Sequence, residues 1–194
     1  MENFFVTIGL GWTMSKILPY IVLLTLGVGV YRLFRKKFRK KWMRITVLLL
    51  MILAPTGIYF AINPIYEGDF SNNYARKQAI DSEWIADGKL TVIAIPGCPF
   101  CLASIARMKQ VKERVGGDVD IEFRVLTKKE ANLKSYENES GGSVTVVMDT
   151  NEIRLSQLAG GRFPTFVFRE GADVYVWSND GFGVRALDWV ESRM

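Results

Sequence analysis

Histidine is absent from this sequence of 194 residues, and cysteine occurs only twice. The lack of histidine excludes Ser-His-Asp and Cys-His catalysis, histidine-ligated haem and nearly every ordinary zinc or copper enzyme site. Two cysteines are too few for a disulfide-dense secreted scaffold. A hydrophobic content of 49% excludes a disordered chain. Few kinds of catalytic chemistry therefore remain.

Acidic residues are missing from one segment that is crowded with basic ones. Residues 32–44 hold eight Lys or Arg side chains and no Asp or Glu, whereas residues 67–194 hold 16 basic and 19 acidic side chains. The formal net charge of +5 thus comes from one short segment rather than from a basic face on a folded module. We expect no nucleic-acid partner. The basic residues of the segment are Arg32, Arg35, Lys36, Lys37, Arg39, Lys40, Lys41 and Arg44.

Two apolar stretches flank this basic segment. Residues 12–31 contain one charged side chain, Lys16, and residues 45–66 contain none. About 20 residues of helix suffice to cross a hydrocarbon core of roughly 30 Å. The pattern predicts a two-helix transmembrane hairpin over residues 1–66, with spans at about 12–31 and 45–66. The alternative is a buried hairpin in a soluble protein.

The basic segment also predicts the orientation of the hairpin. Short loops rich in Lys and Arg are retained in the cytoplasm, so we expect loop 32–44 to be cytoplasmic and both chain ends to be extracytoplasmic. The protein would be a two-pass protein of the plasma (inner) membrane, with its C-terminal domain in the periplasm or an equivalent oxidising space. The loop serves either as a topology signal that contacts membrane lipids, which we favour, or as a specific lipid or protein site.

Residues 67–194 alternate between helix-like and strand-like patterns. Residues 67–88 indicate a linker and an amphipathic helix, with Tyr74, Ile80 and Trp84 as candidate core contacts. The order that follows predicts an α/β fold over residues 89–194, with a mixed central sheet flanked by helices. We expect strands at 90–95, 119–126, 165–168 and 174–177, a short strand or extended loop at 143–148, and helices from Cys98 for about 15 residues, at 127–139, as a turn at 152–158, and from Val184.

The two cysteines lie in the segment Cys98-Pro99-Phe100-Cys101. Two randomly placed cysteines rarely fall three residues apart. The pair follows a predicted buried strand and begins a helix, so the first sulfur should lie near unpaired backbone N–H groups and the positive end of the helix dipole. Both effects stabilise a thiolate and lower the pKa of Cys98, which makes Cys98 the expected attacking sulfur. Cys101 should be more buried and act as the resolving thiol.

Two other interpretations of the cysteine pair stay open. A zinc ion or an iron–sulfur cluster needs further ligands, so either group would have to be shared between two chains. We expect no metal and no cofactor. A purely structural disulfide would close a loop of only four residues, which removes little chain entropy. The spacing therefore favours a redox function.

Together with a second motif, the cysteine pair resembles the thioredoxin-like superfamily over roughly residues 72–194. The first motif is Cys-x-x-Cys at a strand-to-helix junction. The second is Phe163-Pro164-Thr165, which precedes the predicted hairpin and is similar to the cis-proline loop of that fold. The resemblance implies a thioredoxin-like fold in which Pro164 packs against Cys98 and Cys101. The alternative is an ordinary turn at Phe163-Pro164.

The resemblance also implies where a substrate would bind. The backbone of Phe163 would pair with an extended substrate segment beside Pro164, a short case of strand addition. Pro99 and Phe100, between the cysteines, would add contacts, although Phe100 would serve equally well as a cover over the disulfide.

Two positions depart from the family pattern. Gly97 stands where thioredoxins usually place Trp, and Val92 occupies the strand position where many members bury a proton-accepting Asp or Glu. Without that carboxylate, proton removal from Cys101 would need water or a neighbouring group.

With the hairpin in front of it, the domain looks like the membrane-tethered, extracytoplasmic thioredoxin-like proteins of bacteria. The resemblance implies a thiol–disulfide oxidoreductase that acts on protein thiols or disulfides through a mixed disulfide. Because this sequence has no other cysteine, it would need a membrane redox partner, DsbD-like or CcdA-like for reduction and DsbB-like for oxidation. The alternative is a non-catalytic thioredoxin-like scaffold or accessory subunit of a membrane protein complex.

Overall fold

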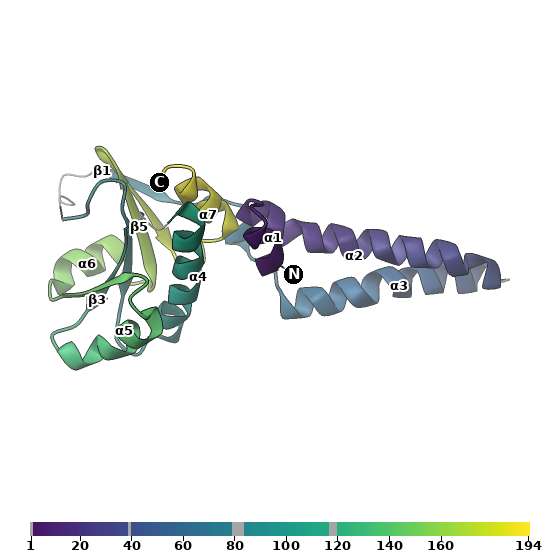
Figure 1. The fold of residues 1–194 in the computed structure, drawn as a ribbon, viewed down its shortest axis with the longest axis horizontal. Helices are drawn as coiled ribbons and strands as arrows, with labels where there is room; N and C mark the ends of the chain where they lie inside the picture. Colours follow the sequence, from purple (N-terminus) through teal and green to yellow (C-terminus); the bar gives the residue numbers. More distant parts are fainter. Residues whose placement is uncertain (1, 39, 79–83, 117–119) are drawn as a thin grey trace. The chain divides into compact units, whose positions relative to one another are not determined.

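The computed structural model describes residues 2–38, 40–78, 84–116 and 120–194. The chain divides into two compact units, Met1–Tyr66 and Glu67–Met194. Each unit has its own set of secondary-structure elements (Figure 1).

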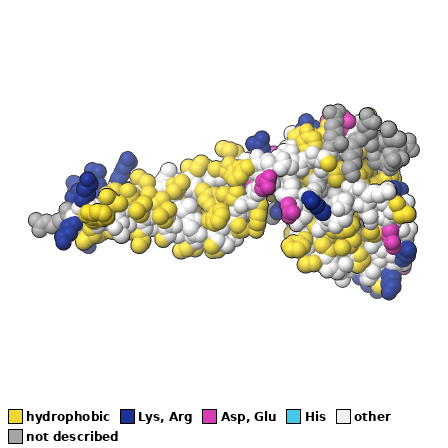
Figure 2. Space-filling model, turned by 180° about the vertical axis from the view of Figure 1, so that it is seen from behind, with side chains coloured by type: hydrophobic (Ala, Val, Ile, Leu, Met, Phe, Trp, Pro, Cys, Tyr) yellow, Lys and Arg dark blue, Asp and Glu magenta, His cyan; other side chains and the backbone are white. Residues whose placement is uncertain are grey.

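The N-terminal unit is a helical hairpin. Its two long helices pack along each other, and Gly27 brings the backbones so close that an added Cβ would lie 2.7 Å from the carbonyl oxygen of Met51. Both long helices are long and apolar enough to cross a membrane. Figure 2 shows hydrophobic side chains along the hairpin and Lys and Arg side chains gathered at its tip. The elements are α1 (Glu2–Thr7), α2 (Trp12–Phe34), η1 (Arg35–Lys37) and α3 (Lys41–Ile62).

The second long helix is shifted relative to the predicted span at 45–66. It begins at Lys41 and ends at Ile62, because Asn63 caps it and Pro64 follows. The Asn63 side chain donates a hydrogen bond from Nδ2 to the Tyr59 carbonyl oxygen at 3.3 Å. The helix therefore ends before Tyr66, the predicted end of the span.

The C-terminal unit is built on a mixed six-stranded sheet in the order β1-β6-β5-β2-β3-β4. Strand β2 runs parallel to β3, and β3 parallel to β4, while the other neighbours are antiparallel. The strands are β1 (Ala75–Gln78), β2 (Leu90–Ala94), β3 (Ile121–Leu126), β4 (Thr145–Asp149), β5 (Thr165–Glu170) and β6 (Asp173–Ser178). The helices are η2 (Glu67–Asp69), α4 (Pro99–Val115), η4 (Glu130–Asn132), α5 (Lys134–Ser140), α6 (Glu152–Ala159) and α7 (Val184–Glu191).

Helices cover both faces of this sheet (Figure 1). On the face of α4 and α7, Phe166 lies between strand neighbours and stacks on Phe182 with ring centroids 3.9 Å apart. On the opposite face, Leu155 of α6 belongs to a buried cluster with Ile93 of β2 and Val167 of β5. The two-sided burial explains why all five residues of β2 are buried.

The helix predicted within residues 67–88 is wrong at its centre. Residues Ala75–Gln78 form an edge strand that pairs with β6. Tyr74, predicted to be a core contact, is 40% exposed, although its ring lies against Trp189 and other aromatic rings of the unit. Trp84 does pack against the core cluster as predicted. Ile80 lies outside the described residues. The edge strand was missed because its partner is remote in the sequence.

The helix predicted at 127–139 is shorter and begins later. The Thr127 hydroxyl oxygen accepts hydrogen bonds from the Lys129 N–H at 3.1 Å and from the Asn132 side chain at 2.8 Å, so the chain turns before it enters η4 and α5. For residues 143–148 we expected either a short strand or an extended loop, and they contain most of strand β4. The strands predicted at 90–95, 165–168 and 174–177, the helix after Cys98 and the final helix from Val184 are confirmed in type.

Removing the stacked ring of Phe166 is expected to destabilise the C-terminal unit. Phe166→Ala leaves a cavity between the sheet and Phe182, so the free energy of unfolding should fall by about 3 to 5 kcal/mol. Denaturant unfolding of the full chain in detergent, followed by near-ultraviolet circular dichroism, measures the change. Phe100→Ala, at a ring that is 64% exposed, is the control and should stay within about 0.5 kcal/mol of the wild type. Equal effects of the two substitutions would contradict this packing.

Candidate active site

The cysteine pair lies directly after the end of a central strand. Strand β2 ends at Ala94, and the chain turns through Ile95, Pro96 and Gly97 before Cys98. Gly97 has a φ of +72°, a conformation that residues with a side chain rarely adopt. A glycine at this position therefore permits the turn that carries the chain from the strand into the helix.

Cys98 is the N-cap residue of α4. Its sulfur accepts a hydrogen bond from the Cys101 backbone N–H at 3.2 Å. Pro99 occupies the first helical position, where its missing N–H costs nothing. The arrangement places the Cys98 sulfur at the N-terminus of a long helix, where a negative charge is stabilised by the helix dipole and by free N–H groups. The geometry thus has what a stabilised thiolate requires.

The two cysteines differ in their exposure to solvent. Cys98 and Cys101 form a disulfide, with their Cα atoms 5.2 Å apart. Cys98 is 9% exposed, whereas Cys101 is completely buried. This confirms the predicted difference in burial, and it makes Cys98 the more accessible of the two residues.

The other predicted site residues have different environments. Phe100 is exposed, while Phe163 is half-buried and packs against the core cluster on the α6 face. Pro164 is buried, and the Phe163–Pro164 peptide bond is cis, as the resemblance implied. The contact of Pro164 with the cysteines and the substrate role of these residues stay predictions.

Tyr136 of α5 is a residue of the site that sequence reasoning missed. Its ring is fully buried, and its hydroxyl donates a hydrogen bond to the Ile95 carbonyl oxygen at 2.7 Å. Burial raises the pKa of Tyr136 to about 12, so the hydroxyl stays protonated at neutral pH. The only sequence signal was the long connection between β3 and the hairpin, which does not reveal that its tyrosine reaches the turn before Cys98.

The buried carboxylate of Glu122 lies on the other face of the sheet from Val92, the position where many thioredoxin-like proteins have an acid. Val92 pairs in register with Phe123, whereas Glu122 pairs with Thr91 and so points to the opposite face of the sheet. Glu122 is held in ion pairs there. Among the described residues, no group of three or more His, Cys, Asp or Glu side chains is placed to hold a metal ion.

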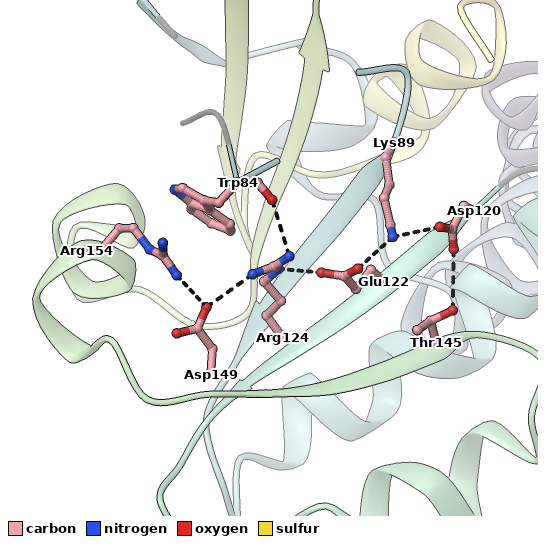
Figure 3. Close-up of polar contacts among 8 residues, drawn as sticks. All are labelled: Trp84, Lys89, Asp120, Glu122, Arg124, Thr145, Asp149 and Arg154. Atoms are coloured by element: carbon pink, nitrogen blue, oxygen red, sulfur yellow. Dashed lines mark hydrogen bonds and ion pairs between the residues drawn. The ribbon is translucent and has the colours of Figure 1, made fainter. Parts of the chain in front are cut away.

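Glu122 belongs to a polar network on the α6 face (Figure 3). Lys89 lies 2.6 Å from a carboxylate oxygen of Asp120 and 2.6 Å from one of Glu122. Arg124 bridges Glu122 and Asp149, with an Arg124–Asp149 distance of 3.3 Å. The network continues from Asp149 to Arg154 at 2.9 Å and from Asp120 to the Thr145 hydroxyl at 3.3 Å.

Trp84 lies between two guanidinium groups of this network. Arg124 and Arg154 place their guanidinium carbons 4.7 and 4.5 Å from the Trp84 ring, and Arg124 also donates to the Trp84 carbonyl oxygen at 3.2 Å. The network therefore fastens the segment before β2 to the sheet, which is a structural role.

No protein-family model matches the sequence, and no curated protein matches it significantly. Among solved structures, a secreted disulfide oxidoreductase of Mycobacterium tuberculosis, described as homologous to E. coli DsbE, is similar at 18% identity and a TM-score of 0.45. The alignment covers 56% of this chain and 84% of that one. The strand order and the cysteine pair at the junction of β2 and α4 match the mixed sheet and the strand-to-helix Cys-x-x-Cys that the resemblance to the thioredoxin-like superfamily implied.

Because of the ion pairs of Lys89, the stability of the C-terminal unit is expected to decrease as the pH rises in the alkaline range. Burial alone would lower the pKa of Lys89, but the hydrogen bonds and charges of Asp120 and Glu122 outweigh it, so the pKa is raised. A lysine whose pKa is higher in the folded than in the unfolded protein stabilises the fold at pH values below its unfolded pKa, about 10.4. This stabilisation is lost as the pH rises through the pKa of the folded protein.

Denaturant unfolding of the full chain in detergent between pH 9 and 12 measures this dependence. At the lower end of this pH range, the free energy of unfolding should be lower in Lys89→Gln than in the wild type. As the pH rises, it should fall less steeply in the variant. Lys128→Gln is the matched control, because Lys128 and Glu152 form an ion pair whose side chains are 71% and 62% exposed. Indistinguishable pH profiles for wild type and Lys89→Gln would refute the assignment.

Proposed function

We propose that this protein is a membrane-anchored, extracytoplasmic thiol–disulfide oxidoreductase. The observation that supports it most directly is the cysteine pair itself. Cys98 caps a helix and is 9% exposed, and Cys101 lies fully buried one turn further on. A pair with one more accessible and one fully buried cysteine suits an attacking and a resolving thiol.

In the reducing direction, the Cys98 thiolate attacks one sulfur of a substrate disulfide. A bond forms between that sulfur and Cys98, and the second substrate sulfur leaves as a thiolate that takes up a proton. Cys101 then loses its proton and attacks the Cys98 sulfur, which breaks the mixed disulfide and releases the first substrate sulfur. The substrate gains two electrons and two protons, and the Cys98–Cys101 disulfide forms. Oxidation of a substrate reverses these steps.

The residues around Cys98 are suited to an extended protein substrate. Phe100 offers an exposed aromatic ring next to the pair, and Pro99 fixes the first turn of the helix. The Phe163 backbone before Pro164 would pair with the substrate chain, while the Phe163 ring stays on the core. Protein thiols and disulfides are therefore the proposed substrates.

The helical hairpin is proposed to anchor the protein in the membrane. All residues of α3 lie in the described part of the chain and none is buried, so its apolar surface needs lipid or another helix around it. The basic loop at the tip would contact membrane lipids on the cytoplasmic side. A membrane redox partner, DsbD-like, CcdA-like or DsbB-like, would supply or remove the electrons.

Substitution of the resolving cysteine is expected to trap substrates. In Cys101→Ser the mixed disulfide with Cys98 cannot be resolved, so covalent adducts sensitive to dithiothreitol should accumulate in cells. Non-reducing gels followed by mass spectrometry identify them. Cys98→Ser is the matched control and should yield at least tenfold fewer adducts, since the remaining thiol is buried. No adducts in Cys101→Ser, in cells grown under reducing and oxidising conditions, would favour a scaffold with a structural bridge.

The proposed topology is tested with single cysteines in a chain that carries Cys98→Ser and Cys101→Ser. We expect a membrane-impermeant maleimide to label Asn179→Cys in intact cells, and Lys36→Cys only after lysis, because both positions are exposed but should lie on opposite sides of the membrane. Labelling of Lys36→Cys in intact cells would show the reverse orientation or an incorrect hairpin assignment.

A further inference from the structure

The turn before Cys98 is held by a side chain from outside the strand–turn–helix segment. The Ile95 carbonyl oxygen accepts the Tyr136 hydroxyl at 2.7 Å and also the Cys98 backbone N–H at 3.4 Å. One carbonyl group thus joins the tyrosine to the reactive residue. Tyr136 comes from α5, in the connection between β3 and β4, so the contact spans 41 positions of sequence.

We propose that Tyr136 is a positioning residue for the dithiol, whose hydroxyl fixes the turn from Ile95 to Cys98 and so keeps the Cys98 sulfur at the N-terminus of α4. This role rests on the proposed oxidoreductase function.

The environment of Tyr136 suits this role rather than a contact with substrate. The side chain is completely buried, and its ring packs against Phe123 of β3 with centroids 6.4 Å apart. Burial raises the pKa of Tyr136 to about 12, so the phenol is protonated at neutral pH and can donate to the Ile95 carbonyl. What it supplies is a fixed geometry.

Loss of the Tyr136 hydroxyl should make the reduced, dithiol form of Cys98 and Cys101 less stable relative to the disulfide. The Ile95 carbonyl would keep the hydrogen bond from the Cys98 N–H but lose the shorter one from Tyr136, and the loss of that bond makes the turn less stable. The partial negative charge of the carbonyl oxygen would also be less compensated close to Cys98. Both changes disfavour the Cys98 thiolate, and a less stable thiolate shifts the equilibrium toward the disulfide.

The test compares Tyr136→Phe with the wild type as full chains in detergent, equilibrated in graded mixtures of reduced and oxidised glutathione. The fraction of reduced pair is read by alkylation and mass. In Tyr136→Phe the equilibrium constant should shift about threefold to tenfold toward the disulfide, which is roughly 14 to 30 mV more negative at 29.6 mV per tenfold.

Ser140→Ala is the matched control. It removes another buried hydroxyl from the same helix. This hydroxyl donates to the Glu137 carbonyl oxygen at 2.9 Å and not to the turn before Cys98. Its equilibrium constant should equal that of the wild type. A second variant incorporates 3-fluorotyrosine at position 136, which keeps the ring and strengthens the donor, so its shift should be opposite to that of Tyr136→Phe.

The outcomes separate this role from the proposed function. If the wild-type pair exchanges with glutathione but Tyr136→Phe and the fluorinated variant do not shift, the role of Tyr136 is overturned and the oxidoreductase function stands. An equal shift in Ser140→Ala would show a general effect of α5 packing and overturn the role as well. If the folded wild-type pair does not exchange at all, both the function and the role are overturned.

Discussion

The pairing of strand β2 on both of its edges is the constraint on which the rest of the C-terminal unit depends. It is hydrogen-bonded to β3 on one side and to β5 on the other, and both of its faces are covered, so its end point is fixed. The turn at Gly97 and the N-terminus of α4 follow from that end point. Cys98 is therefore placed by the sheet, and the helix then provides the N–H groups that favour its thiolate.

Much of the C-terminal unit could be predicted because its signals are local. The apolar run of β2, the Pro-Gly turn and the spacing of Cys98 and Cys101 lie within a dozen neighbouring residues. The difference in burial between the two cysteines follows from helix geometry, and it was confirmed. The same reasoning explains why the final helix and the β5–β6 hairpin were found: each is defined by a short periodic pattern.

What could not be predicted depends on partners remote in sequence. Residues Ala75–Gln78 have no strong strand pattern and become a strand only because β6 offers a free edge. Tyr136 looks like one more residue of a polar helix until the fold brings its hydroxyl to Ile95. The polar network around Trp84 likewise joins side chains from β3, β4 and α6 that no sequence spacing connects (Figure 3). Long-range pairing decides these elements, and single-sequence patterns do not contain it.

The central claim is that the Cys98–Cys101 disulfide exchanges with other thiols while the protein remains folded. The most direct measurement treats the full chain in detergent with graded thiol buffers, counts alkylated cysteines by mass, and follows folding by near-ultraviolet circular dichroism at each step. The account predicts a reversible two-electron transition between disulfide and dithiol with the tertiary signal retained. A disulfide that is reduced only when that signal is lost would contradict it and would leave a structural bridge in a scaffold as the better interpretation.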